Sequence, residues 1–286
     1  MEESYFKYSI ENIIKKRSSI RTYTPEYLPE TIIAELKEYS KSLNGPFNSK
    51  LRFEFITNDS FKDTTGGRIG TYGVIKGAQN FIVLLIKDSD NRSLLDAGYV
   101  FEQLILFATS LDLGTCWLGG TFRKKGLDKA TNMQSDEMIP VISPVGYPEK
   151  NKSLVDRVMK AASSSKKRKP WNELFFDNTI DNPLDEIGAK DYATPLEMVR
   201  LAPSASNIQP WRIIKDNGYW HFFMESSPIV NKALGFEIQR IDMGIAMCHF
   251  ELTAKEKELE GNWLINEKPP QIGNDKLQYI ATWECS

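Results

Sequence analysis

Two short fragments, far apart in the sequence, carry residue types that could form one ligand site. The first is Arg17-Ser18-Ser19-Ile20-Arg21, which places two guanidiniums and a hydroxyl on alternate residues. In an extended segment this alternation carries all three side chains to one side, where they can donate hydrogen bonds to an anion. Taken alone, the pattern is more often a solvated basic turn.

The second fragment is the run Ala202-Pro203-Ser204-Ala205-Ser206-Asn207-Ile208-Gln209-Pro210-Trp211. Its composition alone would fit the end of a helix rich in Ser and Asn, with Pro210 preventing continuation. That explanation accounts for the residue types but not for their order. The order is therefore the more informative feature of this fragment.

The overall composition is that of an ordinary globular protein. The chain has 286 residues, 41% hydrophobic and 26% charged, enough for one large domain or two modest ones. Its net charge of −2 gives no reason to expect nucleic acid or an anionic membrane as a partner. No apolar run reaches the ~20 residues of a membrane span, and Met1–Tyr8 lacks a signal-peptide core. We therefore expect a cytoplasmic protein.

The sequence gives no indication of a metal site. Its three cysteines and two histidines are widely spaced and form no metal-ligand pattern. We expect Cys116, Cys248 and Cys285 to be small buried hydrophobic residues in preference to reactive thiols.

The elements that must position the two fragments occur twice in the chain. One apolar helix is predicted at Tyr99–Leu111 and another at Ile245–Leu259, and each follows an Asp-x-Gly sequence. In each copy a Trp lies 21 residues after the Asp. An Asp at the start and a left-handed Gly after the end are typical helix caps. The expected caps are Asp96 and Gly114 in the first copy and Asp242 and Gly261 in the second.

The flanking elements repeat in the same order, with one helix and two strands before each apolar helix and one strand after it. The first copy is predicted to have a helix at 28–43 and strands at 51–56, 80–86 and 141–147. The second is predicted to have a helix at 194–201 and strands at 211–214, 219–224 and 278–283. The pattern predicts an α+β fold with helices packed on a sheet.

A segment of small and charged residues, 161–171, separates the two copies. Such a composition is typical of a solvated linker. We place the halves at residues 1–178 and 179–286.

The two fragments resemble signatures of the FMN-dependent nitroreductase family. In that family each flavin takes the first signature from one subunit and the second from its twin. Here each signature is present once: 42–48 departs from the second, and no Arg-x-Ser-x-Arg precedes Thr194. The resemblance implies a nitroreductase-like fold in which two tandem halves form an intrachain pseudo-dimer with one flavin site.

The resemblance also implies roles for individual residues. Arg17 and Ser19 would bind the FMN phosphate, and Arg21 would place a cation at the N1/O2 edge of the ring. A glycine-bearing turn would bring backbone close to N5, and the second fragment would cover the ring. Within 166–170, Lys-x-Arg-x-Pro resembles a further phosphate-binding pair, in competition with the linker interpretation. The cofactor-binding residues implied are Arg17, Ser19, Arg21, Gly119, Gly120, Lys166, Arg168, Pro203, Ser204, Ala205 and Asn207.

The implied function is an FMN oxidoreductase that takes hydride from NADH or NADPH and reduces a nitroaromatic, a quinone or a similar acceptor. The flavin performs the redox chemistry, so no catalytic side chain is assigned. We expect a monomer, because the second half would replace the partner subunit.

Two alternatives remain open at this point. One is a non-catalytic FMN-binding protein that stores or senses the cofactor. The other is a different flavin reaction on the same fold, such as reductive dehalogenation, since one fold can host several chemistries.

Overall fold

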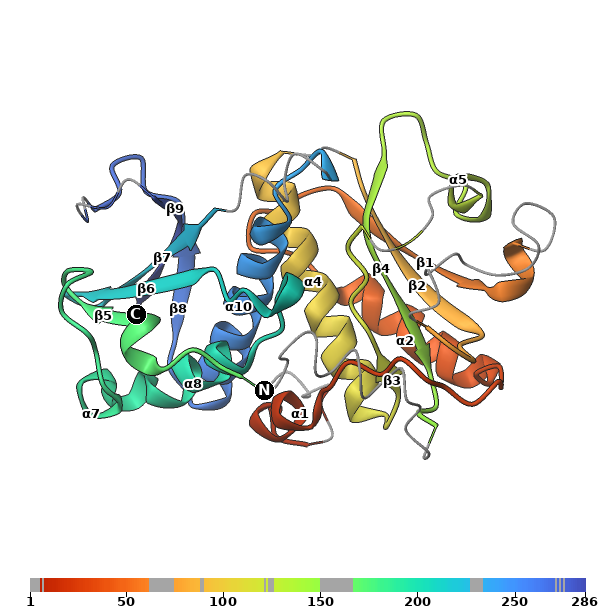
Figure 1. Ribbon diagram of the computed structural model, residues 1–286, viewed down its shortest axis with the longest axis horizontal. Coiled ribbons are helices and arrows are strands. Elements are labelled where there is room, and N and C mark those ends of the chain that lie inside the picture. Colours follow the sequence, from red (N-terminus) through yellow and green to blue (C-terminus); the bar gives the residue numbers. More distant parts are fainter. Residues whose placement is uncertain are drawn as a thin grey trace.

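The computed structural model describes residues 6, 8–61, 75–87, 90–120, 122, 126–149, 167–226, 234–270, 272, 274 and 276–286. These residues form a four-stranded sheet and a five-stranded sheet, with two long helices side by side between them (Figure 1). The mixture of helices and sheets confirms the α+β prediction. Lys166 lies outside the described residues.

The first half builds the four-stranded sheet and one of the long helices. Its strands follow the order β1-β2-β4-β3 and are all antiparallel. Every residue of β2 is buried, as expected for a continuous apolar run. The elements are α1 (Ile10–Lys16), α2 (Glu30–Ser42), β1 (Leu51–Thr57), β2 (Asn80–Ile86), α4 (Asn91–Ser110), β3 (Gly114–Thr115), α5 (Leu127–Ala130) and β4 (Met138–Gly146).

The second half, together with β5 just before it, builds the five-stranded sheet and the other long helix. Its strands follow the order β5-β6-β7-β9-β8, and only the β5–β6 pair in this sheet is parallel. The elements are β5 (Phe175–Asp177), α7 (Glu186–Ala189), α8 (Ala193–Leu201), β6 (Trp211–Asp216), β7 (Tyr219–Glu225), α10 (Ile238–Glu256), β8 (Gly261–Leu264) and β9 (Leu277–Cys285).

Four strands of each sheet are connected in the same way. The order β1-β2-β4-β3 in the first sheet corresponds to β6-β7-β9-β8 in the second, and the long helix follows the second strand in both. The equivalence agrees with a duplicated unit, but an origin by duplication remains a hypothesis. The β5 strand pairs with β6, so the second sheet begins before the predicted boundary at residue 178.

The two long helices contact each other through a reciprocal pair of glycines. A Cβ on Gly98 of α4 would lie 2.0 Å from the carbonyl oxygen of Ile241. A Cβ on Gly244 of α10 would lie 2.0 Å from the carbonyl oxygen of Leu95. Each glycine therefore allows the backbone of the other helix to approach closely. Each glycine thus meets the residue three positions before the other glycine. Such a reciprocal contact is the pattern of a two-fold interface.

The predicted caps of the long helices were wrong. The α4 helix begins at Asn91 with Asp90 as its N-cap, and α10 begins at Ile238. Asp96 and Asp242 therefore lie inside the helices, where their carboxylates accept hydrogen bonds from loop backbone instead.

The glycines after the helices are not the left-handed residues either. Asp112 and Glu258 take that conformation, with φ of 62° and 58°. Glycine is needed at positions 114 and 261 because other parts of the chain lie very close. A Cβ on Gly114 would lie 2.9 Å from the Ile20 side chain, and a Cβ on Gly261 would lie 2.5 Å from the Glu284 carbonyl oxygen.

Candidate functional site

The segment that follows α1 has the extended backbone that its alternating pattern predicts. Ile20 N–H donates to the Thr115 carbonyl at 2.8 Å, and Ser19 pairs with Thr115 of β3. On the other side, Lys76 N–H donates to the Arg21 carbonyl at 2.8 Å. These bonds fix the extended segment beside β3, the backbone geometry that the one-sided arrangement of Arg17, Ser19 and Arg21 requires.

The two arginines of this segment keep buried donor atoms unused. The Arg17 side chain is only 7% exposed, and its Nε lies 3.7 Å from Glu102 Oε1, too far for a hydrogen bond. Within the described part of the chain, Arg17 Nε and Arg21 Nε and Nη1 have no hydrogen-bond partner. Buried guanidinium donors without acceptors are costly, so this arrangement favours binding of an anion or of a ligand rich in acceptors.

Arg168 brings a third guanidinium to the same region from far along the chain. It donates to the Asn207 side-chain oxygen and, at 2.9 Å, to the Leu201 carbonyl. Its pKa is lowered to about 10, first by burial and then by the positive charges of Arg17 and Arg200. Arg200 is neutralised by a two-point ion pair with Glu197, whereas Arg17 lies close enough to Arg168 for the two positive charges to interact.

The second fragment has a strained backbone that side chains hold in place. Ser206, Asn207 and Gln209 have positive φ values of 51°, 58° and 54°. The Ser204 hydroxyl accepts from Gln209 N–H at 2.9 Å, and Asp242 Oδ1 accepts from Ala205 N–H at 2.9 Å. Left-handed backbone at three non-glycine residues is unfavourable and is often found at binding sites.

The glycine turn packs against the start of α10. Gly120 has a φ of +76°, and a Cβ there would lie 2.3 Å from Leu234 Cδ2. A Cβ on Gly119 would lie 2.6 Å from Ile238 Cδ1, one turn before Asp242. The glycine turn and the second fragment thus meet the same end of α10. Packing alone explains the two glycines, and their role beside a flavin remains a prediction.

Two polar side chains at this end of α10 also have unused atoms. Asp242 Oδ2 and both amide atoms of Gln239 lack a partner among the described residues, although both side chains are buried. Burial raises the pKa of Asp242 to about 7. Unpartnered polar atoms at this depth mark a place where a ligand could supply the missing hydrogen bonds.

A buried network that the sequence analysis missed joins these parts. Glu102 of α4 is fully buried and accepts from Trp117 Nε1 at 2.7 Å. Its other oxygen lies 2.9 Å from His249 Nε2 of α10. A carboxylate and an imidazole inside two apolar helices were the available signal, because such groups are buried only when paired.

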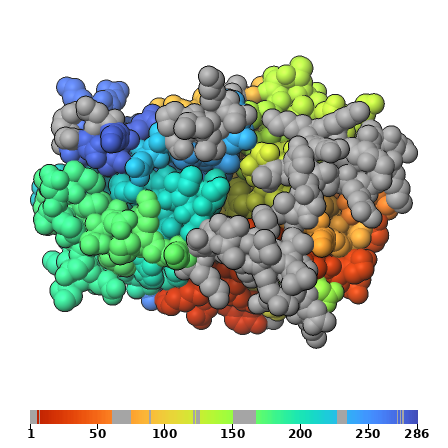
Figure 2. All heavy atoms as spheres, in the orientation of Figure 1, coloured from red at the N-terminus to blue at the C-terminus, as the bar shows by residue number. Residues whose placement is uncertain are grey.

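Several of the predicted site residues lie close together in the structure. Arg17, Arg168 and Asn207 lie in one region, and Ser19 and Arg21 share the segment of Arg17. In the described part of the chain, the atoms nearest to a Cβ on Gly119 or Gly120 belong to Ile238, Val141 and Leu234 and not to these cations. The glycine turn is connected to them indirectly. Trp117, two residues before the turn, donates to Glu102, and Glu102 lies beside Arg17. On the surface, the N-terminal segment lies along the lower edge of the face in Figure 2, next to atoms of the second half.

Comparison with known proteins supplies a family for this arrangement. The family model described as "Putative TM nitroreductase" matches residues 9–254. No curated protein matches the sequence. Within the described part of the chain, no helix is both long and apolar enough to cross a membrane.

Several solved structures are similar to this chain. A structure described as a putative nitroreductase from Thermotoga maritima is 21% identical with a TM-score of 0.60, over 96% of this chain and 93% of its own. A nitroreductase with bound FMN from Desulfitobacterium hafniense is 18% identical with a TM-score of 0.41, over 50% of this chain and 90% of its own. A protein described as a putative NADH oxidase from Clostridium acetobutylicum is 25% identical with a TM-score of 0.39, over 49% and 89%. The first of these similarities extends over nearly the whole chain and shows the nitroreductase fold.

Proposed function

The chain belongs to the putative TM nitroreductase family, and from that premise we propose that it is an FMN-dependent oxidoreductase of nitroreductase type. The observation that carries the proposal is the set of buried, unused guanidinium donors on Arg17 and Arg21, with Arg168 close to Arg17. A phosphate dianion and the acceptor-rich edge of a flavin ring are the groups that such donors fit.

The residues of the chain can be given roles toward FMN. Arg17, Ser19 and Arg168 would hold the phosphate, with Lys166 as a further candidate. Arg21 would donate to the N1/O2 edge and stabilise the charge that gathers there on reduction. FMN would supply hydride acceptance and donation at N5, chemistry that no side chain of the protein provides.

The ring would be held by the glycine turn on one side and the second fragment on the other. Backbone at Gly119 and Gly120 is proposed to approach N5. The segment that contains Pro203, Ser204, Ala205 and Asn207 is suited to flat packing, because most of its side chains are small and hydrogen bonds to Lys167 and within the segment fix its backbone. Water would be excluded from the ring by this segment.

For the substrates we propose NADH or NADPH as the hydride donor and a nitroaromatic or quinone as the acceptor. The proposal rests on the family. The same argument predicts one FMN per chain and a monomer, with residues 1–178 and 179–286 as the two halves of a pseudo-dimer. The equivalent sheet connections and the reciprocal glycine contact support this arrangement.

The test is to purify the protein with FMN, measure flavin per chain, and add NADH or NADPH without oxygen. One flavin per chain and rapid bleaching of its visible absorbance are expected. Slow bleaching would favour the storage or sensor alternative. Two flavins per chain, or a stable dimer in light scattering, would contradict the single site in a pseudo-dimer.

A further inference from the structure

His249 of α10 is fully buried and reaches across to α4. Its Nδ1 is 2.9 Å from the carbonyl oxygen of Met198 in α8. Its Nε2 is 2.9 Å from Glu102 Oε1 in α4. The imidazole therefore connects three helices from both halves of the molecule.

The Met198 carbonyl oxygen can only accept a hydrogen bond, and so can Glu102 when it is ionised. Both ring nitrogens of His249 then face acceptors. A neutral imidazole has one N–H and one acceptor nitrogen, so it could satisfy only one of these contacts. The geometry therefore requires that His249 and Glu102 together hold one proton more than a neutral imidazole and an ionised carboxylate would. The imidazolium form with an ionised Glu102 also suits Trp117 Nε1, which donates to the other carboxylate oxygen at 2.7 Å.

Two ionisable groups of the described residues lie close to Glu102: Arg17, at the end of α1, and Cys248, on α10. Burial and the charge of Glu102 raise the pKa of the Cys248 thiol well above its ordinary value, so the thiol stays neutral. Arg17 and His249 thus share one carboxylate, and a positive charge is left over.

That surplus charge lies where the phosphate site is proposed. Arg17 and His249 carry two positive charges against the one negative charge of Glu102, and Arg168 adds a third positive charge. The net charge of about +2 matches the −1.5 to −2 of a phosphate monoester at neutral pH.

We propose that Glu102 and His249 are positioning residues of the flavin site, which hold Arg17 toward the phosphate and keep an extra proton as part of its counter-charge. Through Trp117 the same carboxylate steadies the chain just before the glycine turn. Through Met198 the imidazole steadies α8, which leads into the ring-covering segment. This inference rests on the FMN site proposed above.

The second half offers a matched control. Glu251 of α10 accepts from Trp263 Nε1 at 2.7 Å and, across the helix crossing, from the Tyr99 hydroxyl at 2.6 Å. Its cation is Lys255, which is 63% exposed. Burial and Glu251 raise the pKa of Tyr99 well above its ordinary value, so the phenol is a neutral donor. Glu251 therefore has the same structural bonds without the surplus buried charge.

The experiment uses Glu102→Gln, His249→Gln and the control Glu251→Gln in the full chain. Gln at 102 can still accept from Trp117 and can donate to a neutral His249, so this variant keeps its hydrogen bonds and should fold. The first measurement is the protonation state of His249 in the FMN complex, by ¹⁵N NMR of histidine-labelled protein. The chain has only two histidines, and His221 serves as the internal reference because burial lowers its pKa.

We expect both ring nitrogens of His249 to be protonated in the wild type and only Nδ1 in Glu102→Gln. The dissociation constant for FMN should rise about tenfold in Glu102→Gln and His249→Gln and stay within about twofold in Glu251→Gln. A neutral His249 in the wild-type complex, or unchanged FMN binding in Glu102→Gln, overturns the inference. A wild-type protein that binds no FMN overturns the proposed function instead, and the protonation state of His249 in that protein still tests the pair.

Discussion

Asp96 and Asp242 occupy equivalent places on the two long helices but hold their loops differently. Asp96 uses both oxygens, accepting from Phe47 N–H at 3.1 Å and from Ser49 N–H at 2.9 Å. Asp242 uses one oxygen, accepting from Ala205 N–H, and among the described residues its Oδ2 has no partner. The first loop is thus fully satisfied, whereas the second keeps an unused buried acceptor.

The backbones of the two loops differ in the same direction. The first contains one left-handed residue, Asn48, and the second contains Ser206, Asn207 and Gln209. Strain and unsatisfied polar atoms persist where function requires them. The first loop is therefore held by satisfied hydrogen bonds, whereas the second combines left-handed backbone with an unused buried acceptor, features that are often found at ligand sites.

The largest effect is expected where the two halves are most alike, at the helix crossing. Gly98→Ala and Gly244→Ala should each lower the free energy of unfolding by about 4 kcal/mol or more, because the new Cβ would collide with backbone of the other helix. Gly218→Ala is the control: its φ is +85° but nothing lies within 4 Å, so about 1 kcal/mol is expected. Urea denaturation followed by circular dichroism measures all three. Clearly unequal losses at Gly98 and Gly244 would show that the crossing is not two-fold symmetric in energy.

Asp242→Asn should change how stability depends on pH. Burial raises the pKa of Asp242 in the folded protein to about 7, above the 3.8 of a free side chain. Between these values the folded state holds a proton that the unfolded state has lost, so stability falls as the pH rises from about 4 to 7 and then levels off. Asn cannot ionise, and the variant should avoid a loss on the order of 3 kcal/mol.

The matched variant Asp96→Asn is expected to behave differently. Burial also raises the pKa of Asp96, but both of its oxygens accept backbone N–H groups. An Asn there leaves one N–H without an acceptor and should cost roughly 1–3 kcal/mol, a loss where Asp242→Asn gives a gain. Thermal unfolding between pH 4 and 8 distinguishes the two. A wild-type stability that does not fall over this range would refute the raised pKa of Asp242.

The cations of the site are expected to affect FMN affinity unequally. Arg17→Ala and Arg168→Ala should each raise the dissociation constant roughly 10–100-fold, since each removes a charge-assisted hydrogen bond of about 1.5–3 kcal/mol. The effect should shrink at high salt. Arg200→Ala, which removes a nearby guanidinium already paired with Glu197, should change affinity less than about threefold. Fluorescence titration of FMN checks this, and a normal affinity for Arg168→Ala would return residues 161–171 to the role of a linker.

Arg21→Ala should change the redox potential more than the affinity. A cation at the N1/O2 edge stabilises reduced relative to oxidised FMN, so its loss should lower the midpoint potential by roughly 30–60 mV, equivalent to about 1.5–3 kcal/mol for two electrons. Spectroelectrochemical titration measures the shift. An unchanged midpoint would exclude the role assigned to Arg21.

The sequence predicted elements whose signal is local. The apolar run Asn80–Ile86 coincides with β2, and the helix after Pro29 corresponds to α2. The strand β3 escaped prediction because it contains only Gly114 and Thr115 and exists through its pairing with β4. Helix starts were misplaced because an Asp before an apolar run looks like a cap, whereas Asp96 bonds to a loop nearly fifty residues away in sequence.

The candidate site was predicted from ordered sequence motifs, and its role toward FMN stays a prediction. Arg17 and Arg168, although distant in sequence, do lie close together. Glu102 and His249 could not be paired from the sequence, because their contact depends on how α4 crosses α10. The close crossing depends on Gly98 and Gly244, and their contacts can be recognised only when the packing of the two helices is known.

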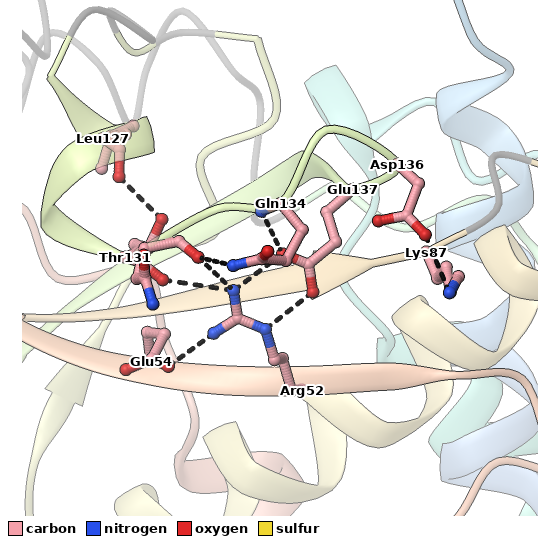
Figure 3. A network of polar contacts seen from close by, with 9 residues as sticks. Arg52, Glu54, Lys87, Leu127, Thr131, Gln134, Asp136 and Glu137 are labelled. Atoms are coloured by element: carbon pink, nitrogen blue, oxygen red, sulfur yellow. Dashed lines mark hydrogen bonds and ion pairs between the residues drawn. The ribbon is translucent and has the colours of Figure 1, made fainter.

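The smallest effect concerns the second residue of β1 and of β6, which is Arg in both halves. Arg52 joins β1 to the loop before β4 through Glu137, with bonds of 2.7 Å from Nε and Nη2 (Figure 3). Arg212 donates to the carbonyl oxygens of Gln209 and Trp211, at the end of the second fragment. It also pairs with Glu225 of β7. The same residue therefore stabilises a sheet edge in one half and the candidate site in the other.

Glu137→Gln should cost about 1 kcal/mol at pH 7, the discounted value of a partly exposed ion pair, and should leave FMN affinity unchanged. The Arg52 guanidinium lowers the pKa of Glu137 to about 2, so the contribution of this pair is complete above about pH 4.5 and is lost as the pH falls toward 2. The variant and the wild type should therefore converge in stability on the acid side. Arg212→Lys should cost a similar amount but should also weaken FMN binding about threefold, because a lysine cannot donate to both carbonyls in the same geometry. Urea denaturation and FMN titration of the two variants test this. Equal FMN affinity in both would mean that Arg212, like Arg52, only stabilises its sheet.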